Sequence, residues 1–301
     1  MNKDRKIIRH LSKPASFGEW FYRMRFTVAR RFIQLSILIL FFGTLHFGWS
    51  FLGRPLLEGN LSTSKVLGLI PLSDPFGALQ RLLAQHWLNL ETLAGASLVL
   101  LFYWIVGGRV FCSWVCPMNL VTDLAAWVRR KIGIKTDFLH LSKNFRYLLL
   151  ALSLVLSFLS GTAAFEWLSP QALLWREWVY GIGAGFLSAL LGVFAFDLAV
   201  LHRGWCGHLC PLGAFWGIVG TTSQVKVLFN AQTCTHCADC LKVCPEPQVL
   251  NFVKAEQKGF IASGECTNCG KCISVCPEQS LNFGLRCQIQ RNKNEITTQG
   301  E

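Results

Sequence analysis

The chain carries the run Cys234-Thr-His-Cys237-Ala-Asp-Cys240-Leu-Lys-Val-Cys244-Pro245 and repeats its spacing in Cys266-Thr-Asn-Cys269-Gly-Lys-Cys272-Ile-Ser-Val-Cys276-Pro277. In each run three thiols are close enough to bind from one tight loop, and the fourth lies beside a proline that turns the chain. Thiolates in sets of four are typical ligands of iron–sulfur clusters and of zinc. A zinc ribbon needs only two C-x₂-C pairs, so the extra cysteine in each run and the trailing Cys-Pro favour clusters.

The spacing C-x₂-C-x₂-C-x₃-C-P, present twice, is that of bacterial ferredoxins with two [4Fe–4S] clusters. In that arrangement the fourth cysteine of each run ligates the cluster of the other run. We therefore expect one cluster on Cys234, Cys237, Cys240 and Cys276, and the other on Cys266, Cys269, Cys272 and Cys244. Because the exchanged cysteines join the two halves, cluster binding is expected to stabilise a domain that has little core of its own.

The rest of the chain is unusually apolar. Hydrophobic residues make up 52% of the 301 residues, charged residues only 15%, and the mean hydropathy is +0.38. These values indicate membrane spans instead of an ordinary soluble domain. The 13 cysteines would suggest disulfides in a small secreted protein, but eight of them have cluster-ligand spacing. We therefore expect the cysteine-rich part to face a reducing compartment.

Four apolar stretches are long enough to cross about 30 Å of hydrocarbon, and they cover residues 32–52, 88–106, 145–168 and 178–201. Of the Lys and Arg residues, 25 lie in the N-terminal tail, the loop between the second and third spans and the C-terminal region, against four in the other two loops. Because positive residues remain on the cytoplasmic side, we expect a multi-pass protein of a bacterial inner membrane with both termini cytoplasmic. The net charge of +12 then reflects topology, and no nucleic-acid partner is expected.

The second and fourth spans end in similar sequences, 94 residues apart. One is Cys112-Ser-Trp-Val-Cys116-Pro117 and the other is Cys206-Gly-His-Leu-Cys210-Pro211. Residues four apart share one face of a helix and proline disrupts the helical ladder, so each pair is expected at a helix end with both thiols on one side. Each motif follows a span that runs toward the cytoplasm, so a hairpin duplicated in parallel orientation is expected to bring the four thiols together at the cytoplasmic face. There they hold a further iron–sulfur centre or another metal, act as a dithiol relay, or are buried structural cysteines.

These patterns predict an α-helical membrane protein with four transmembrane helices in a duplicated hairpin, followed by an α+β domain of the bacterial two-[4Fe–4S] ferredoxin type. The expected domains are a basic cytoplasmic tail (1–31), a membrane domain with two C-x₃-C-P motifs (32–222), the ferredoxin domain (223–285) and a polar tail (286–301). Residues 66–75, which contain two prolines, are expected to form an interfacial loop.

Four spans, two C-x₃-C-P motifs and a C-terminal pair of ferredoxin runs together resemble the NapH-type ferredoxin subunit of periplasmic nitrate reductase systems. The shared sequence comprises Pro71-Leu-Ser-Asp-Pro75, Cys112-Ser-Trp-Val-Cys116-Pro, Trp205-Cys-Gly-His-Leu-Cys210-Pro and Cys244-Pro-Glu-Pro-Gln-Val-Leu250. The resemblance implies a subunit of a quinol dehydrogenase complex, with membrane lipid and quinol around it. It also implies a periplasmic ferredoxin-type partner subunit and electron delivery toward a periplasmic nitrate reductase, in some organisms through a multihaem cytochrome.

The sequence leaves open an alternative of a different class. An assembly or maintenance factor, which supplies electrons to the metal centre or thiols of a membrane or periplasmic metalloenzyme, needs the same clusters and membrane thiols. The direction of electron flow separates the two functions. Ionisable residues in or beside the spans are the candidates for accepting protons from quinol; the sequence selects none among Asp197, Glu166, Glu91, His86 and His46.

Overall fold

The computed structural model describes residues 16–51, 53–60, 62–85, 87–134, 136–180 and 184–287. The chain divides into two units, which are described separately. The cluster unit combines Met1–Phe32, Trp104–Val110 and Gly217–Glu301, and the helical unit combines Ile33–Tyr103 and Phe111–Trp216. Most of the polar tail expected at 286–301 lies outside the described residues.

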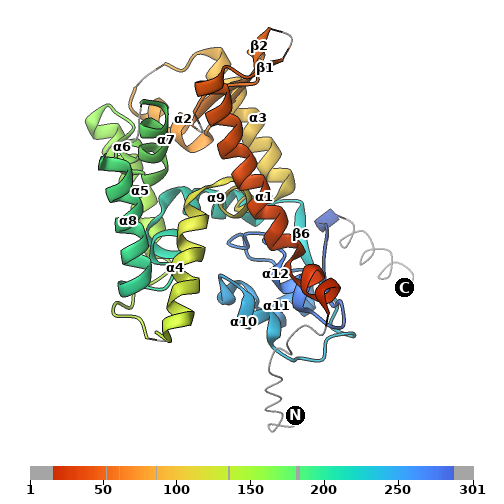
Figure 1. Cartoon of the computed structure of the whole chain (residues 1–301). Helices are drawn as coiled ribbons and strands as arrows, with labels where there is room; N and C mark the ends of the chain where they lie inside the picture. Colours follow the sequence, from red (N-terminus) through yellow and green to blue (C-terminus); the bar gives the residue numbers. More distant parts are fainter. Residues whose placement is uncertain are drawn as a thin grey trace, which may run out of the picture. The chain divides into compact units, whose positions relative to one another are not determined.

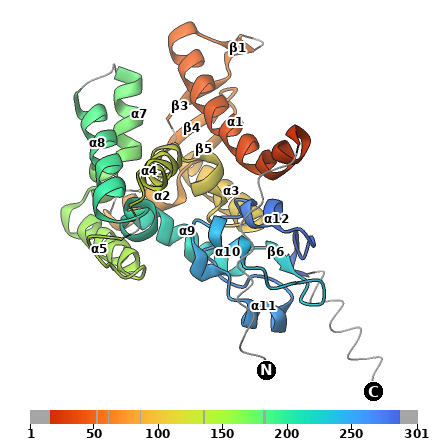
Figure 2. The ribbon, with the colours of Figure 1, turned by 60° about the horizontal axis from the view of Figure 1, so that its bottom comes forward.

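The described residues of the helical unit form all or part of nine helices, several of which are visible in Figures 1 and 2. They are α1 (Phe17–Phe47), α2 (Pro75–Leu83), α3 (Leu90–Val106), α4 (Met118–Ile132), α5 (Phe145–Ser160), α6 (Ala164–Leu168), α7 (Pro170–Tyr180), α8 (Ala184–Ala195) and α9 (Pro211–Thr222). Three π-helical turns accompany them among the described residues: η1 (Phe111–Val115), η2 (Phe196–Val200) and η3 (Trp205–Leu209).

α7 and α8 lie side by side in both views, and α8 also packs against α4. Phe41, Met118, Val121, Leu174 and Val193 form a buried cluster among these helices.

Among the described residues one helix, α1, is both long and apolar enough to cross a membrane. Three other apolar helices are shorter, Leu90–Val106, Phe145–Ser160 and Leu187–Val200. The 17 residues of α3 rise about 26 Å, less than the hydrocarbon thickness. α5 ends at a left-handed Gly161 (φ +66°), and the rest of the expected third span continues as the short α6. Of the four predicted spans, the structure shows a helix of sufficient length for the first alone, among the described residues. The multi-pass arrangement therefore stays a prediction.

α1 begins at Phe17, so residues 17–31 of the expected basic tail are helical. Ser16 Oγ accepts a hydrogen bond from Glu19 N (3.3 Å), which is half of a capping box. Glu19 also pairs with Arg23 one turn later (2.5 Å). Phe26 packs against the core of the cluster unit, with its ring 5.6 Å from that of Phe283. The sequence Ser16-x-x-Glu19 indicates a helix start here. The interpretation of this segment as a basic tail, based on its many Lys and Arg residues, missed it.

The expected interfacial loop is folded. After the hairpin of β1 (Ser50–Phe51) and β2 (Arg54–Pro55), β3 (Leu57–Gly59), β4 (Thr63–Val66) and β5 (Ile70–Ser73) form an antiparallel sheet in that order. Asp74 then caps α2, because its carboxylate accepts hydrogen bonds from Phe76 N (3.2 Å) and Gly77 N (3.1 Å). At Gly95, α3 lies so close to β5 that a Cβ would be 2.9 Å from Pro71 O, which requires glycine there.

The cluster unit is built on one strand pair and short helices. β6 (Val225–Phe229) pairs antiparallel with β7 (Leu281–Leu285). Around it lie α10 (Asp239–Val243), the 3₁₀ turn η4 (Pro247–Val249), α11 (Phe252–Lys258) and α12 (Lys271–Val275). The core is small and consists of Val227, Phe229, Val249, Leu250, Ala255, Ile261, Cys272, Ile273 and Leu281, with further cysteines packed against it. This α+β arrangement agrees with the expected ferredoxin-like C-terminal domain.

Phe76→Ala tests the packing of α2. Phe76 is 1% exposed, and its ring lies 5.7 Å from that of Phe165 and 5.5 Å from that of Phe215. The cavity left by alanine costs about 3–5 kcal/mol, so we expect a clear fall in the thermal unfolding midpoint followed by intrinsic fluorescence. Leu82→Ala, on the same helix but 54% exposed, is the control and should change stability by less than about 0.5 kcal/mol. Equal midpoints for the two variants would contradict this packing.

Candidate metal centres

The first expected ligand set lines one cavity of the cluster unit. Its thiols belong to Cys234, Cys237, Cys240 and Cys276. Apolar side chains, including Phe229, Leu241, Phe252 and Leu281, form much of the remaining wall. Three of the four thiols come from the first run and one comes from the second, so the structure brings together the crossed set that the spacing predicts.

The second expected set lines a separate cavity of the same unit. Its thiols belong to Cys244, Cys266, Cys269 and Cys272, and the wall includes Val227, Val249 and Leu250. Here the single thiol from the first run joins three from the second. The eight cysteines are therefore divided between two cavities as two interlocked clusters require.

The tight loops of the two runs have left-handed backbone conformations at the same two positions. His236 (φ +54°) and Ala238 (φ +62°) are left-handed in the first run, and Asn268 (φ +46°) and Gly270 (φ +72°) occupy the matching positions of the second. Left-handed residues other than glycine are strained and persist where the surrounding structure over-determines them. A centre held by three closely spaced thiols supplies that constraint. α10 and α12 begin at the loop ends and carry the third cysteine of each run.

Burial controls the protonation of these thiols. It raises the pKa of Cys240 and Cys266 to about 11 and that of Cys244 to about 12. The thiols therefore keep their protons at neutral pH unless iron displaces them, and cluster assembly releases protons.

Two buried cations lie beside the second cavity and favour thiolate there. Arg109 is 2% exposed, donates a hydrogen bond to Glu265 O (3.0 Å) and pairs with Glu246 (3.6 Å). Lys226 is also 2% exposed, and both cations lower the pKa of Cys266 against the effect of burial. Burial in turn lowers the pKa of Lys226 to about 8.

The four thiols of the C-x₃-C-P motifs line a third cavity, in the helical unit. They belong to Cys112, Cys116, Cys206 and Cys210, and the wall also includes Phe165, Gln171 and Trp205. Cys116 Sγ donates a hydrogen bond to Gln171 Oε1 (3.4 Å). The convergence expected from the repeat is therefore present in the structure.

Each C-x₃-C-P motif forms a π-helical turn, and the two turns are built alike. Cys116 N donates to Phe111 O (2.9 Å), and Cys210 N donates to Trp205 O (2.9 Å). Both hydrogen bonds span five residues, and such a wide turn places cysteines four apart almost in line. The following proline lacks an N–H and ends the turn, and α4 and α9 begin there.

Buried polar side chains from other helices hold the two turns. Gln34 of α1, 0% exposed, donates to Ser113 O (3.0 Å) and Cys116 O (3.3 Å) in and after η1. Arg146 of α5, also 0% exposed, donates to Gly207 O (3.3 Å) in η3. These donors satisfy carbonyl oxygens at turns that depart from the regular helical ladder. Sequence reasoning missed both roles, and a polar residue within an apolar helix was the available signal.

Asp197 also positions the second turn. Its Oδ1 accepts a hydrogen bond from Trp205 N (2.9 Å), the first residue of η3, and its carbonyl oxygen accepts one from Arg129 (3.3 Å). Arg203, just before η3, forms an ion pair with Asp123 of α4. This candidate for proton transfer therefore supports the cysteine turn through backbone contacts.

The other ionisable candidates lie in different settings. Glu91 is 68% exposed and pairs with Lys65 (2.6 Å). The ring of His46 lies 4.4 Å from that of Phe42, and His86 falls outside the described residues. Glu166 belongs to a buried polar network that is described below.

The donor sets fit clusters better than single ions. Within the described part of the chain, no three His, Cys, Asp or Glu side chains converge closely enough to hold one metal ion. A [4Fe–4S] cluster has its irons at separate corners, so its four ligands stand further apart than the four ligands of a zinc ion. Four thiols spread around one cavity meet that requirement. The cysteines therefore fit iron–sulfur clusters, and zinc is disfavoured.

Two family models match the chain. A 4Fe-4S binding domain matches residues 88–135 and again residues 182–227, and a 4Fe-4S dicluster domain matches residues 226–277. The first model covers each C-x₃-C-P motif once, in agreement with the repeat, and the second covers both cysteine runs. Fold and sites together define an iron–sulfur electron-transfer protein of the ferredoxin type.

Similar sequences identify the family within this class of iron–sulfur proteins to which the chain belongs. The chain is 46% identical over 234 residues to the ferredoxin-type protein NapH of Haemophilus influenzae, covering 77% of this chain and 78% of the relative. It is 44% identical to the methylamine utilization ferredoxin-type protein MauN of Methylobacillus flagellatus (76% and 79% covered) and 41% identical to NapH of Escherichia coli (77% and 78%). The chain therefore belongs to the NapH/MauN family of ferredoxin-type proteins. No solved structure matches it.

Cys244→Ser tests the exchange of ligands between the runs. We expect the EPR spectrum of the dithionite-reduced protein to change at one cluster only, and this should be the cluster that Cys269→Ser also perturbs. The reason is that Cys244 shares a cavity with Cys269 and not with the other thiols of its own run. Cys287→Ser, at an exposed thiol, is the control and should leave both signals intact. If Cys244→Ser reproduces the effect of Cys237→Ser instead, the ligands are not exchanged.

Proposed function

We propose that this chain is the membrane subunit of a quinol dehydrogenase. It takes electrons from quinol and passes them, with a periplasmic iron–sulfur partner, toward a periplasmic nitrate reductase. The apolar helices α1, α3, α5 and α8 cross a bacterial inner membrane with both termini cytoplasmic. The observation that carries the proposal is a third set of four thiols among these apolar helices, in addition to the two sets in the cluster unit. Iron–sulfur clusters, when bound, supply the one-electron steps that quinol oxidation needs.

The third set of thiols, on Cys112, Cys116, Cys206 and Cys210, holds a further iron–sulfur centre in this proposal. Their common cavity supports it, and so does the match of a 4Fe-4S binding domain over each motif.

Contacts within the helical unit support the proposed topology. α2 lies in the loop after α1, and α6 lies in the loop after α5. Ser157 Oγ donates to Gln80 Oε1 (3.3 Å), and Arg81 of α2 pairs with Glu166 of α6 (3.3 Å). The two loops that carry few basic residues therefore meet at one end of the helices, as the positive-inside rule requires if both face the periplasm.

The family leaves the electron acceptor open, and this favours a second candidate function. The MauN relative is as similar to this chain as the NapH relatives, and its name refers to methylamine utilization. What the relatives share with this chain is the electron-transfer unit. That unit also suits an assembly or maintenance factor, which would supply electrons to the metal centre of a membrane or periplasmic enzyme.

Quinol should act as electron donor to the full-length protein. We expect menadiol, added anaerobically to membranes that contain the protein, to reduce at least one iron–sulfur centre, because a dehydrogenase accepts electrons from quinol. EPR follows the reduction, and membranes without the protein are the control. If menadiol leaves every centre oxidised while dithionite reduces them, electrons enter from another donor and the assembly function replaces the proposed one.

Cys206→Ser and Cys112→Ser test the third centre. Each variant should lower the iron content from about twelve to about eight atoms per chain, since one [4Fe–4S] cluster is lost. The EPR signals of the two clusters in the cluster unit should remain after dithionite reduction, whereas their reduction by menadiol should be abolished. Unchanged iron content and unchanged reduction by menadiol would mean that these thiols are structural.

A further inference from the structure

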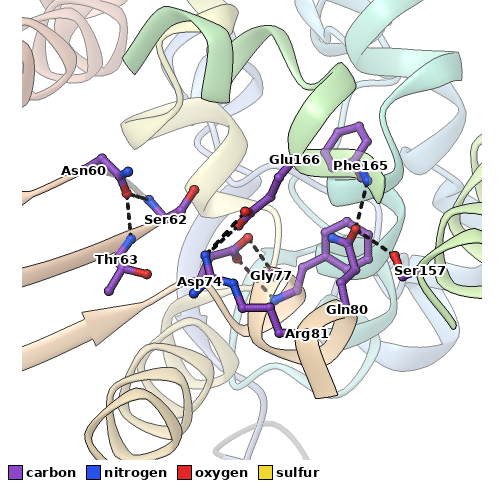
Figure 3. A network of polar contacts seen from close by, with 11 residues as sticks. Asn60, Ser62, Thr63, Asp74, Gly77, Gln80, Arg81, Ser157, Phe165 and Glu166 are labelled. Atoms are coloured by element: carbon purple, nitrogen blue, oxygen red, sulfur yellow. Dashed lines mark hydrogen bonds and ion pairs between the residues drawn. The ribbon is translucent and has the colours of Figure 1, made fainter. Parts of the chain in front are cut away.

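A buried polar network lies in the helical unit outside the three sets of thiols (Figure 3). It joins the last turn of α2 to α5 and α6. Gln80 of α2 is 0% exposed, and its Oε1 accepts hydrogen bonds from Ser157 Oγ (3.3 Å) and from Phe165 N (3.0 Å). The next residue, Arg81, places Nη2 3.3 Å from both carboxylate oxygens of Glu166.

Two carboxylates from different elements converge on this network. A Cβ built on Gly77 would lie 3.0 Å from Glu166 Oε1 and 3.5 Å from Asp74 Oδ2, so these oxygens are within 6.5 Å of each other. Among the residues whose side chains are described, Arg81 is the cation that faces the pair, and Tyr103 of α3 is within electrostatic range of Asp74. One positive charge for two carboxylates leaves the site able to take up a proton.

The environment of Asp74 supports this capacity. Burial, helped by the nearby charge of Glu166, raises the pKa of its carboxyl to about 6, although the hydrogen bonds from Gly77 N and Phe76 N and the charge of Arg81 lower it. Asp74 therefore changes protonation near physiological pH. A group with this property at the end of an apolar helix bundle is suited to proton transfer.

Two polar atoms, one in the network and one on the residue that precedes Asp74, have no partner among the described residues. They are Gln80 Nε2 and Ser73 Oγ, on side chains that are 0% and 4% exposed. An unsatisfied buried donor costs about 1–3 kcal/mol, so a purely structural clamp would leave this cost uncompensated. The same atoms can bond the oxygen atoms of a ligand.

The network adjoins the four-cysteine cavity of the helical unit. Phe165, whose N–H bonds to Gln80, is part of the wall of that cavity, and Glu166 is the next residue. Tyr103 is 9% exposed and lies within electrostatic range of the thiols of Cys112 and Cys116 as well as of Asp74. The carboxylates and the thiols are therefore neighbours, with aromatic side chains at their border.

The surface next to Glu166 is apolar. Trp167 is 66% exposed and Leu168 is 72% exposed, while the side chain of Glu166 itself is 29% exposed. A lipid-soluble ligand can approach the carboxylate over these side chains, and a small number of polar groups at the end of an apolar approach is typical of such sites.

We propose that Asp74 and Glu166 are the proton acceptors of a quinol site beside the four-cysteine centre. This inference rests on the proposed function. Quinol approaches over Trp167 and Leu168 with its hydroxyl groups toward the carboxylates. Gln80 Nε2 donates a hydrogen bond to one of the two hydroxyl oxygens. The two O–H bonds break and one proton passes to each carboxylate. An oxidised iron–sulfur cluster held by Cys112, Cys116, Cys206 and Cys210 would accept the two electrons, one at a time, and pass each one on. The quinol leaves as quinone.

Isosteric variants of the full-length protein test this assignment. Asp74→Asn and Glu166→Gln remove the proton acceptors, and we expect reduction of the centres by menadiol to slow about 100-fold in each. Iron content and reduction by dithionite should match the wild type. Glu91→Gln, in the ion pair with Lys65, removes another carboxylate of the helical unit and should leave the rate unchanged.

Two further measurements separate a role in the reaction from a structural role. The wild-type rate should rise with pH through about 6, because Asp74 accepts a proton only when it is ionised, and Asp74→Asn should lose this dependence. Equilibrium binding of menadione, followed by quenching of tryptophan fluorescence, should weaken about tenfold in Gln80→Glu, which replaces the free donor by an acceptor.

The outcomes distinguish this inference from the proposed function. If menadiol does not reduce the wild-type protein, the proposed function fails and the quinol site fails with it. If menadiol reduces the wild type, and Asp74→Asn and Glu166→Gln at the same rate, the proton-acceptor assignment is overturned while the proposed function stands. Menadione binding that is unaffected by Gln80→Glu would overturn the placement of the ring.

Discussion

Every set of four thiols in this protein draws its members from two segments that are distant in the sequence, and the fold is arranged to bring those segments together. In the cluster unit, Cys276 joins the first run and Cys244 joins the second. In the helical unit, one pair comes from each C-x₃-C-P motif. Because burial raises the pKa of the ferredoxin thiols, they are most stable as ligands when a metal centre replaces their protons. Cofactor binding and folding of the cluster unit are thus coupled.

In the helical unit the convergence of thiols depends on backbone turns that a regular helix does not provide. The two π turns leave carbonyl oxygens that need donors, and Gln34 and Arg146 reach them from α1 and α5. A buried arginine is expensive unless its hydrogen bonds are made, so this contact links the position of α5 to the second pair of cysteines. The helices around the cavity are therefore positioned by polar contacts, while apolar contacts such as those of Phe41 and Met118 fill the space between them.

The spacing of the cysteines along the chain restricts which thiols can meet, and the structure places the eight ferredoxin cysteines in two cavities in the groups that this spacing predicts. The repetition of the C-x₃-C-P motif likewise predicted that its four thiols converge, and they line the third cavity. Helix length was harder to predict, because hydropathy does not register Gly161, whose left-handed conformation ends α5 within an apolar stretch. The start of α1 was missed for the opposite reason, since basic residues dominated a segment with a good N-terminal cap.

The acid network could not be derived from sequence for a different reason. Arg81 and Glu166 lie 85 residues apart, and neither stands in a spaced motif. Glu166 was a candidate only as an ionisable residue near the end of a span, and Asp74 belonged to a segment that was expected to be a loop. Tertiary packing of α2 on α5 creates the site, and the local pattern of each segment carries no information about the other. Such sites emerge only when the fold is known.

The location of this network bears on how electrons leave a protein whose ferredoxin clusters are expected on the cytoplasmic side of a membrane. With the proposed topology, α2 and α6 face the periplasm, so quinol oxidised there releases its protons on that side. An electron that crossed the whole membrane toward the cytoplasm would move against a potential that is negative inside, at a cost of about 2.3 kcal/mol per 100 mV. Transfer from the site of quinol oxidation to a periplasmic partner, without passage through the cluster unit, avoids that cost. Whether the two clusters of the cluster unit give electrons to the four-cysteine centre or receive them from it depends on the relative reduction potentials of the centres.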